Sequence, residues 1–344
     1  MTDKPVLAGL LPERIKELLS DYPAFRSVQI YEWICRGAAS FEEMSNLPVS
    51  LRRELAEKYE LISGGLNSEL RDSDGTVKLG IRLADGAVIE TVLLSDGKGR
   101  KTACLSTQAG CPIGCVFCKT GMIGFKRNLA AAEIAGQFLH LRHRERGISH
   151  IVIMGMGEPL LNLDELRKTL DFFSDPGGLN ISKRRITLST NGIEKGIIDL
   201  TENGPEIRLA LSLTTAREEL RRRLMPGSAP LPGLKRALLD YQKKRKRRIT
   251  LEMVLLGRIN TGPPDAKAAA DFAAGLDAVI NLIPWNHVDN MEFEGSRLRT
   301  PSTREISEFT TALENLGLKV TRRTGKGLGI AGACGQLGDR GAHC

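Results

Sequence analysis

Short β-rich runs alternate with stretches of helical apolar spacing from about residue 100 to residue 285, and this alternation is the strongest constraint on the fold. Helical patterns such as LAAAEIAGQFLHLRHR and LDELRKTLDFF separate runs that have the composition of strands. A strand, a helix and a second strand at this spacing favour a parallel sheet with helical crossovers. The pattern predicts an α/β fold of six β-α units, either an open sheet or a partial barrel, with strands at residues 102–107, 150–155, 185–190, 207–213, 248–256 and 278–285.

Polar or glycine-rich segments follow these predicted strands. They are a cysteine-rich loop and the sequences MGMGEP, TNG, TTA and WNH. In parallel sheets of this kind the active site lies at the carboxyl ends of the strands. We therefore expect these segments to meet at one end of the sheet and to hold the functional residues.

The part of the chain before residue 99 has a different pattern. Residues 1–70 contain the helical patterns LPERIKELLSDY, SVQIYEWICRGA and LPVSLRRELAEKY, which predict a small N-terminal helical domain. Residues 71–98 alternate apolar and polar residues around Asp85 and Gly86, as in a β-hairpin that connects two domains. Residues 99–344 then form the α/β domain.

The charge of the chain favours a polyanionic partner. The formal net charge is +8 over 344 residues, with basic runs at residues 182–185, 243–248 and 320–327. Such runs are also common at solvated helix ends, but together they favour nucleic acid. Aromatic residues make up only 5% of the chain, which gives little support for single-strand binding by stacked rings. No export signal or stretch of eighteen apolar residues is present, so we expect a cytoplasmic protein with no membrane contact.

Four of the seven cysteines fall between Cys104 and Cys118. In a chain without an export signal, such a group favours metal binding or catalysis over structural disulfides. Cys111, Cys115 and Cys118 form a C-x3-C-x2-C motif with three thiolates. A closed zinc site takes four ligands, and an iron-sulfur cluster normally does too, so three cysteines leave one iron open to reaction. A zinc site remains the alternative.

This motif, with Phe117 before its last cysteine, resembles the radical S-adenosylmethionine (SAM) superfamily. The resemblance implies one 4Fe-4S cluster bound by the three cysteines, with SAM at the open iron and cleaved to a 5′-deoxyadenosyl radical. The sequence MGMGEP resembles the Gly-Glu-Pro element of the superfamily. Gly157 and Glu158 are therefore expected to bind the amino group of SAM.

Longer segments resemble one family within that superfamily, the bacterial RlmN and Cfr adenosine methyltransferases. They include ETVLLSDGKGRKTACLSTQAGCPIGCVFCKTGMIGFKRNL, SKRRITLSTNGI, INLIPWN and GACGQLG, in the family's order. The resemblance implies that one SAM methylates Cys334 and that a second SAM generates the radical that activates this methyl group. It also implies that Cys104 releases the product by forming a disulfide with Cys334, and that Glu90 accepts a proton.

The same resemblance implies further SAM contacts at Ser189, Ser212, Leu213, Thr214 and Asn286. Two departures from the family pattern affect this set. The family usually has His where this chain has Thr214, so a contact through an imidazole is absent or replaced by a hydroxyl. After Asn286 the sequence HVDNMEFEGSRLRTPS replaces a proline-rich segment, which changes a loop expected to face RNA.

The resemblance favours a SAM-dependent enzyme that methylates C2 of an adenosine in 23S rRNA, and also in tRNA. The alternatives are a Cfr-type enzyme that methylates C8, and a non-catalytic RNA-binding protein stabilised by a metal. For the enzyme, we expect the helical domain to grip RNA, an electron donor such as flavodoxin to reduce the cluster, and the protein to be a monomer.

Overall fold

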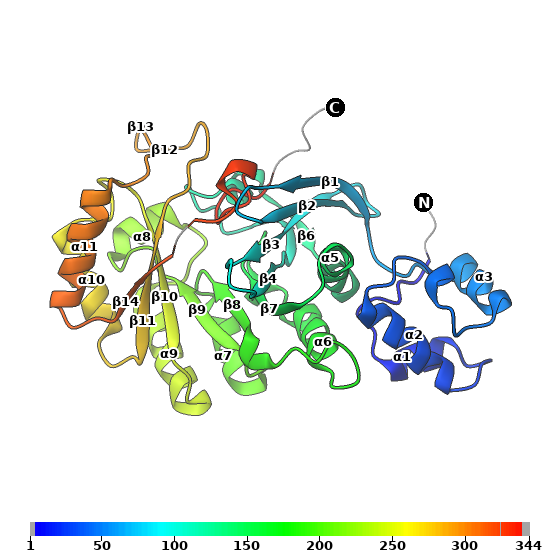
Figure 1. The fold of residues 1–344 in the computed structure, drawn as a ribbon. Coiled ribbons are helices and arrows are strands. Elements are labelled where there is room, and N and C mark those ends of the chain that lie inside the picture. Colours follow the sequence, from blue (N-terminus) through cyan, green and yellow to red (C-terminus); the bar gives the residue numbers. More distant parts are fainter. Residues whose placement is uncertain (1–3, 324, 339–344) are drawn as a thin grey trace.

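A single ten-stranded sheet forms the centre of the molecule (Figure 1), in the order β1-β2-β3-β4-β7-β8-β9-β10-β11-β14. The computed structural model describes residues 4–323 and 325–338. Neighbouring strands from β4 to β14 are parallel, whereas β1 to β4 pair antiparallel. The parallel part confirms the predicted α/β fold.

All six predicted strands of the α/β part are present. They are β4 (Lys101–Cys104), β7 (Ile148–Ile153), β8 (Ile186–Thr190), β9 (Arg208–Ser212), β10 (Ile249–Leu255) and β11 (Ala278–Pro284). A further short strand, β14 (Val320–Arg322), pairs with β11 and was not predicted. Its three residues include two exposed polar side chains, so it lacks the apolar run that marks the other strands.

Helices cover the outer face of the parallel strands (Figure 1). They are α5 (Ala131–Arg144), α6 (Leu163–Ser174), α7 (Glu194–Asn203), α9 (Leu231–Arg245), α10 (Pro263–Ala273) and α11 (Thr303–Asn315). Side chains alternate between the two faces of each strand. On β10, Leu251 and Met253 are fully buried in the hydrophobic core, whereas Thr250 and Glu252 face the concave side and line cavities. The polar residues of β10 therefore face inward.

The N-terminal helices pack beside α5 and α6 (Figure 1). They are α1 (Pro12–Leu18), α2 (Phe25–Arg36), the 3-10 helix η1 (Phe41–Glu43) and α3 (Val49–Lys58). The hydroxyl of Tyr31 on α2 donates a hydrogen bond to Asp175 Oδ2 (2.9 Å), and its ring packs edge-on against Phe172. These contacts join the helical unit to the α/β part.

Three antiparallel strands follow the helical unit: β1 (Gly65–Arg71), β2 (Val77–Arg82) and β3 (Val88–Ser95). The predicted hairpin corresponds to β2 and β3, which are joined at Asp85 and Gly86. β1 lies mostly in the segment predicted to be helical, and it pairs with β2. The three strands extend the central sheet because β3 pairs with β4.

Short elements occupy the loops of the chain. They are β5 (Gln108–Gly110), α4 (Lys119–Ile123), β6 (Phe125–Asn128), η2 (Pro159–Leu161), η3 (Lys183–Arg185), α8 (Glu218–Leu224), β12 (Glu292–Phe293), β13 (Ser296–Arg297) and η4 (Leu328–Ile330). Most of these loops follow the carboxyl ends of the parallel strands, where the site was expected. Among the described residues, no helix has both the length and the apolar character needed to span a membrane.

Candidate active site

The cysteine loop follows β4 and β5 and is held by backbone hydrogen bonds. Gly110 has a left-handed φ of +79°, and a Cβ at this position would overlap the Gly124 carbonyl oxygen. This close approach allows the Cys111 N–H to donate to the same carbonyl (3.0 Å). On the other side, Trp285 Nε1 donates to the Phe117 carbonyl (2.9 Å) and ties the loop to the end of β11. The loop is therefore fixed at both sides of its three cysteines.

The thiols of Cys111, Cys115 and Cys118 line one cavity at the carboxyl end of the sheet. Burial raises the pKa of Cys111 to about 12 and raises the pKa of Cys115 well above its ordinary value. The pKa of Cys118 is also raised, chiefly by burial. Each thiol disfavours the charge of its neighbours, so three thiolates are stable here only next to a positively charged group such as bound iron.

These donors fit an iron-sulfur cluster better than a single ion. Among residues 4–323 and 325–338, no three His, Cys, Asp or Glu side chains lie close enough together to hold one metal ion. A zinc site requires four donors within about 2.3 Å of one point. A four-iron cluster is larger and takes each thiolate at a separate iron, so Cys111, Cys115 and Cys118 would hold it and leave one iron open.

Glu158 lies beside the cysteines at the loop that follows β7. Its carboxylate accepts hydrogen bonds from Thr190 Oγ1 (2.7 Å) and from the N–H groups of Asn191 (2.7 Å) and Leu160 (3.1 Å). Burial nevertheless raises its pKa to about 7. A cationic ligand group would offset this cost of burial, as the resemblance to the SAM-binding element implies.

Most of the expected SAM-binding residues share the cavity of the three cysteines. The lining includes Gly157, Glu158, Ser189, Ser212, Thr214, Asn286 and also Cys334. Leu213 is the exception, because its side chain is fully buried in the hydrophobic core and does not line the cavity. Within the described residues, the buried Thr214 hydroxyl has no hydrogen-bond partner. An unpaired polar atom in this position suits a polar ligand.

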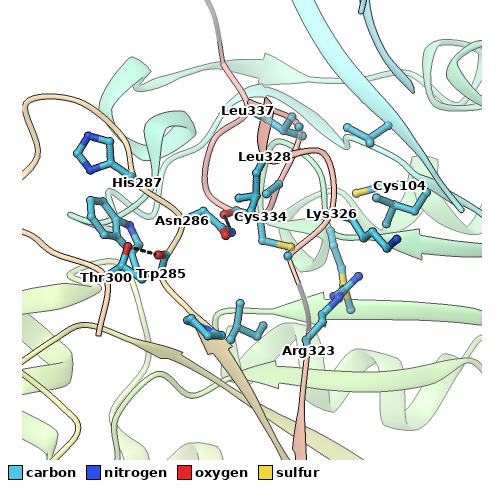
Figure 2. A pocket seen from close by; sticks show the side chains of 18 of the residues that line it. Cys104, Trp285, Asn286, His287, Thr300, Arg323, Lys326, Leu328, Cys334 and Leu337 are labelled. Carbon is cyan, nitrogen blue, oxygen red and sulfur yellow. Dashed lines mark hydrogen bonds between the residues drawn. The ribbon is translucent and has the colours of Figure 1, made fainter. Parts of the chain in front are cut away.

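Cys104 and Cys334 line a second cavity of about 590 Å³ (Figure 2), which shares Asn286, Trp285 and Cys334 with the first. Cys104 is the last residue of β4, and Cys334 belongs to the C-terminal segment. Asn286 Nδ2 donates to the Cys334 carbonyl oxygen (2.9 Å). Both cysteines are free thiols, so the implied disulfide is not present as a structural bond. Burial raises the pKa of Cys104 to about 12.

Glu90 lies on β3, on the same face as Val92 and Leu94, which line the second cavity. Its carboxylate pairs with Lys78 Nζ (3.0 Å), and both side chains are buried. Gly338 N–H donates to the other carboxylate oxygen (2.5 Å). The expected proton acceptor is therefore beside the C-terminal segment, in a buried ion pair.

Three charged residues of the site were missed by the sequence analysis. Glu252 on β10 accepts a hydrogen bond from Ser189 Oγ (3.2 Å), and burial raises its pKa. Arg323 lies near Cys334, Glu252 and Cys104, and its electrostatic interaction with these groups raises its pKa. Arg221 on α8 is 1% exposed and donates to the carbonyls of the loops after β8 and β9. The sequence offered one indication of Glu252, a charged residue within the apolar run RITLEMVLL. It offered none for the two arginines, because arginine is common on protein surfaces.

Comparisons with known proteins find matches to both the α/β part and the helical unit. The radical SAM superfamily matches residues 105–265, and the ribosomal RNA large subunit methyltransferase N-terminal domain matches residues 7–61. A probable dual-specificity RNA methyltransferase RlmN from Treponema denticola is 49% identical over 342 residues, covering 99% of this chain and 97% of the relative. A relative with the same description from Thermus thermophilus is 39% identical over 341 residues, covering 97% and 93%.

The fold also has a match among solved structures. The crystal structure of a radical SAM methyltransferase from Sphaerobacter thermophilus has a TM-score of 0.90 and 34% identity, and covers 97% of this chain and 99% of that chain. Similarity therefore extends over the helical unit, the hairpin and the α/β part together. The chain belongs to the RlmN family of radical SAM RNA methyltransferases.

Proposed function

We propose that this enzyme methylates C2 of an adenosine in 23S rRNA, and also in tRNA, through a methyl group carried by Cys334. One observation supports the proposal most directly: Cys334 is in the wall between the cavity of the three cysteines and the cavity that contains Cys104. A methyl carrier needs this position, because it must receive the group on one side and deliver it on the other. The dual-specificity description of the relatives supports tRNA as a second substrate.

In this proposal, Cys111, Cys115 and Cys118 hold one 4Fe-4S cluster, and two SAM molecules are used per turnover. When bound there, such a cluster would supply one-electron reducing chemistry to SAM. Glu158 holds the amino group of SAM as a carboxylate. The other proposed SAM contacts are Gly157, Ser189, Ser212, Leu213 through its backbone, Thr214 and Asn286.

Residues of the chain itself then carry the methyl group, release the product and accept a proton. Cys334 carries the methyl group, and Asn286 fixes its backbone through the carbonyl. Cys104 attacks the sulfur of Cys334, which forms a disulfide and breaks the bond between that sulfur and the carbon joined to the RNA. This carbon keeps the electron pair and takes up a proton, equivalent to the one that the Cys104 thiol loses, to become the product's methyl group. The disulfide takes two electrons to return to two thiols. Glu90 accepts a proton at its carboxylate. The high pKa of Cys104 keeps it as a thiol in the ligand-free protein.

The proposed organisation gives each part of the chain a task. Residues 1–70 grip the RNA, residues 71–98 connect the two domains, and residues 99–344 form the catalytic partial barrel with its C-terminal cysteine segment. An electron donor such as flavodoxin reduces the cluster, and the enzyme acts as a monomer in the cytoplasm. A non-catalytic RNA-binding role is not favoured, because the family consists of methyltransferases.

The decisive experiment identifies the product. The reconstituted enzyme is incubated without oxygen with a reductant, labelled SAM and either rRNA or tRNA, and the digested RNA is analysed by mass spectrometry. We expect 2-methyladenosine; 8-methyladenosine would instead identify a Cfr-type enzyme.

A variant tests the role of Cys104 in the same assay. Cys104→Ala should trap a covalent protein-RNA complex, because the thiol that releases Cys334 is missing. Cys35→Ala is the control, since Cys35 is equally buried but lies on α2 in the helical unit. Normal turnover by Cys104→Ala without an adduct would contradict the assigned role.

A further inference from the structure

We propose that the β1–β2 turn and Lys78 position the Cys334 segment for catalysis. This segment is defined as residues 325–338. The inference rests on the proposed role of Cys334 as the methyl carrier, and it assigns Asp72, Asp74 and Lys78 as positioning residues that act through the backbone of the segment.

The β1–β2 turn contacts the segment on the amino-terminal side of Cys334. Asp74 Oδ2 accepts a hydrogen bond from the Gly327 N–H (3.0 Å), and Asp72 Oδ2 accepts one from the Gly329 N–H (2.9 Å). Gly327 has a φ of +70°, and a Cβ there would lie 2.8 Å from Thr76 Cγ2. The backbone of the segment therefore packs directly against the β1–β2 turn, and a residue with a side chain at position 327 would push the segment away from this turn.

The buried ion pair between Lys78 and Glu90 contacts the segment on both sides of Cys334. Lys78 Nζ donates to the Ala331 carbonyl (3.3 Å), and Glu90 accepts from the Gly338 N–H (2.5 Å). Ala331 is three residues before Cys334 and Gly338 is four residues after it. One ion pair thus fixes both ends of the turn that carries the thiol.

The opposite side of the segment is held by the active-site loops. Lys119 N–H donates to the Gly335 carbonyl (2.8 Å), Thr120 Oγ1 donates to the Leu337 carbonyl (2.7 Å), and Gln336 Nε2 donates to the His287 carbonyl (2.8 Å). The segment therefore bridges the hairpin and the loops that carry the cysteines. Figure 1 shows it beside β1 and β2, far in sequence from both.

A purely structural role explains this arrangement less well. A buried ion pair costs much of its attraction in lost hydration, and apolar residues of similar size are often at least as stabilising. Both side chains of the pair also bond the backbone of the segment, Lys78 at the Ala331 carbonyl and Glu90 at the Gly338 N–H. The pair therefore determines where the segment lies, and the position of Cys334 follows from that.

The test compares variants in the full reconstituted enzyme, each of which removes the contacts of one side chain: Lys78 loses its bonds to Glu90 and Ala331, and Asp74 loses those to Gly327 and Lys326. Lys78→Met removes the ammonium group and keeps a long side chain, and Lys78→Arg restores a cation. Asp74→Asn keeps the oxygen that accepts from Thr76 N–H but replaces the oxygen that accepts from Gly327. Arg82→Met is the matched control, because Arg82 is exposed at the end of β2 and its side chain donates a hydrogen bond to Asn67.

Two measurements are made without RNA: S-methylation of Cys334 by SAM, followed by peptide mass spectrometry, and backbone hydrogen exchange of residues 325–338. For Lys78→Met and Asp74→Asn we expect methylation to slow at least tenfold at saturating SAM, with an unchanged KM for SAM, and exchange in the segment to accelerate. Lys78→Arg should recover most of the rate, and Arg82→Met should behave as wild type.

The proposal is overturned if both Lys78→Met and Asp74→Asn show wild-type methylation and exchange. If Lys78→Met does not fold, Asp74→Asn alone decides, because it retains the buried ion pair. A wild-type enzyme that never methylates Cys334 would refute the proposed function, while the exchange measurement would still test whether the hairpin holds the segment.

Discussion

Glu158 is buried and accepts hydrogen bonds from three donors. Burial and these hydrogen bonds have opposite effects on the pKa of its carboxylate. The donors favour its charged form, but burial is the larger effect and raises its pKa to about 7. Near neutral pH the residue is therefore half protonated in the ligand-free protein. Only the ionised form can pair with an ammonium group, which makes SAM binding sensitive to pH.

SAM affinity should increase as the pH rises from about 6 to about 8. With a pKa near 7, the ionised fraction of Glu158 grows from roughly one tenth to roughly nine tenths over this range, so we expect a change of about five- to tenfold. Titration calorimetry of the reconstituted enzyme at several pH values measures this. Glu158→Gln should bind SAM weakly without this pH step, whereas the exposed control Asp164→Asn should retain it. Identical pH profiles for wild type and Glu158→Gln would contradict the assignment.

Residues within a distinctive motif could be located from sequence, whereas isolated charges could not. Cys111, Cys115 and Cys118 have a diagnostic spacing, and the structure brings them together with Glu158. Arg323 was read as part of a basic surface run, but it points into the cavity between Cys104 and Cys334 (Figure 2). Sequence gives no sign of this, because the direction of a single long side chain depends on how β14 pairs with β11.

At the level of elements, the strands of the α/β part were predictable because each is a compact apolar run between helices. β1 was missed since its residues are mostly exposed, and without a buried face there is no strong alternation to detect. The contacts of the β1–β2 turn and β2 with the Cys334 segment could not be predicted from the sequence either. They depend on side-chain to backbone hydrogen bonds between residues about 250 positions apart.

Helix α8 illustrates how one buried residue ties separate loops together. The guanidinium of Arg221 donates to the carbonyls of Leu213 (3.2 Å) and Asn191 (2.6 Å), which lie just after β9 and β8. Burial lowers its pKa to about 10, so it still carries its charge at neutral pH. The neighbouring Arg222 has a side chain that is 69% exposed and pairs with Glu219.

Arg221→Met should reduce the free energy of unfolding by about 3 kcal/mol, because it leaves buried carbonyl groups without donors. Arg222→Met should leave the free energy of unfolding nearly unchanged, since it affects only a solvated ion pair. Urea denaturation of the cluster-free proteins gives both values. A loss of the same size in the two variants would show that Arg221 does not hold the loops together.

Across the whole molecule, the positive charge counted from the sequence is larger than the positive charge that is left unpaired by carboxylates on the surface. The run at residues 243–248 is the most basic stretch of the sequence, but four of its residues pair with carboxylates: Lys244 with Glu202, Arg245 and Arg247 with Glu206, and Arg248 with Asp277. By contrast, Arg185 and Arg208 form no ion pair within the described residues. The run that dominates the sequence is thus largely neutralised.

Arg185 and Arg208 lie at a concave surface that leads toward the proposed reaction site. With Arg100 they surround His150, and burial and these three cations lower the pKa of that imidazole. Their cavity of about 710 Å³ shares Met154, Arg323 and Lys326 with the cavity of Cys104 and Cys334. Unpaired cations at this place can bind the phosphates of RNA that extends from the reactive adenosine.

Removing Arg185 and Arg208 should weaken RNA binding more than removing two cations from the basic run at residues 243–248. Each lysine or arginine that contacts a phosphate contributes about one to the slope of log affinity against log salt concentration. We therefore expect Arg185→Ala/Arg208→Ala to reduce that slope by about two, measured by fluorescence anisotropy with an rRNA fragment. Lys243→Ala/Lys246→Ala removes the same charge from the two residues of the run that form no ion pair with any described residue, and it should change the slope little. Equal reductions would mean that RNA responds to overall charge, and that the concave surface does not guide it to the site.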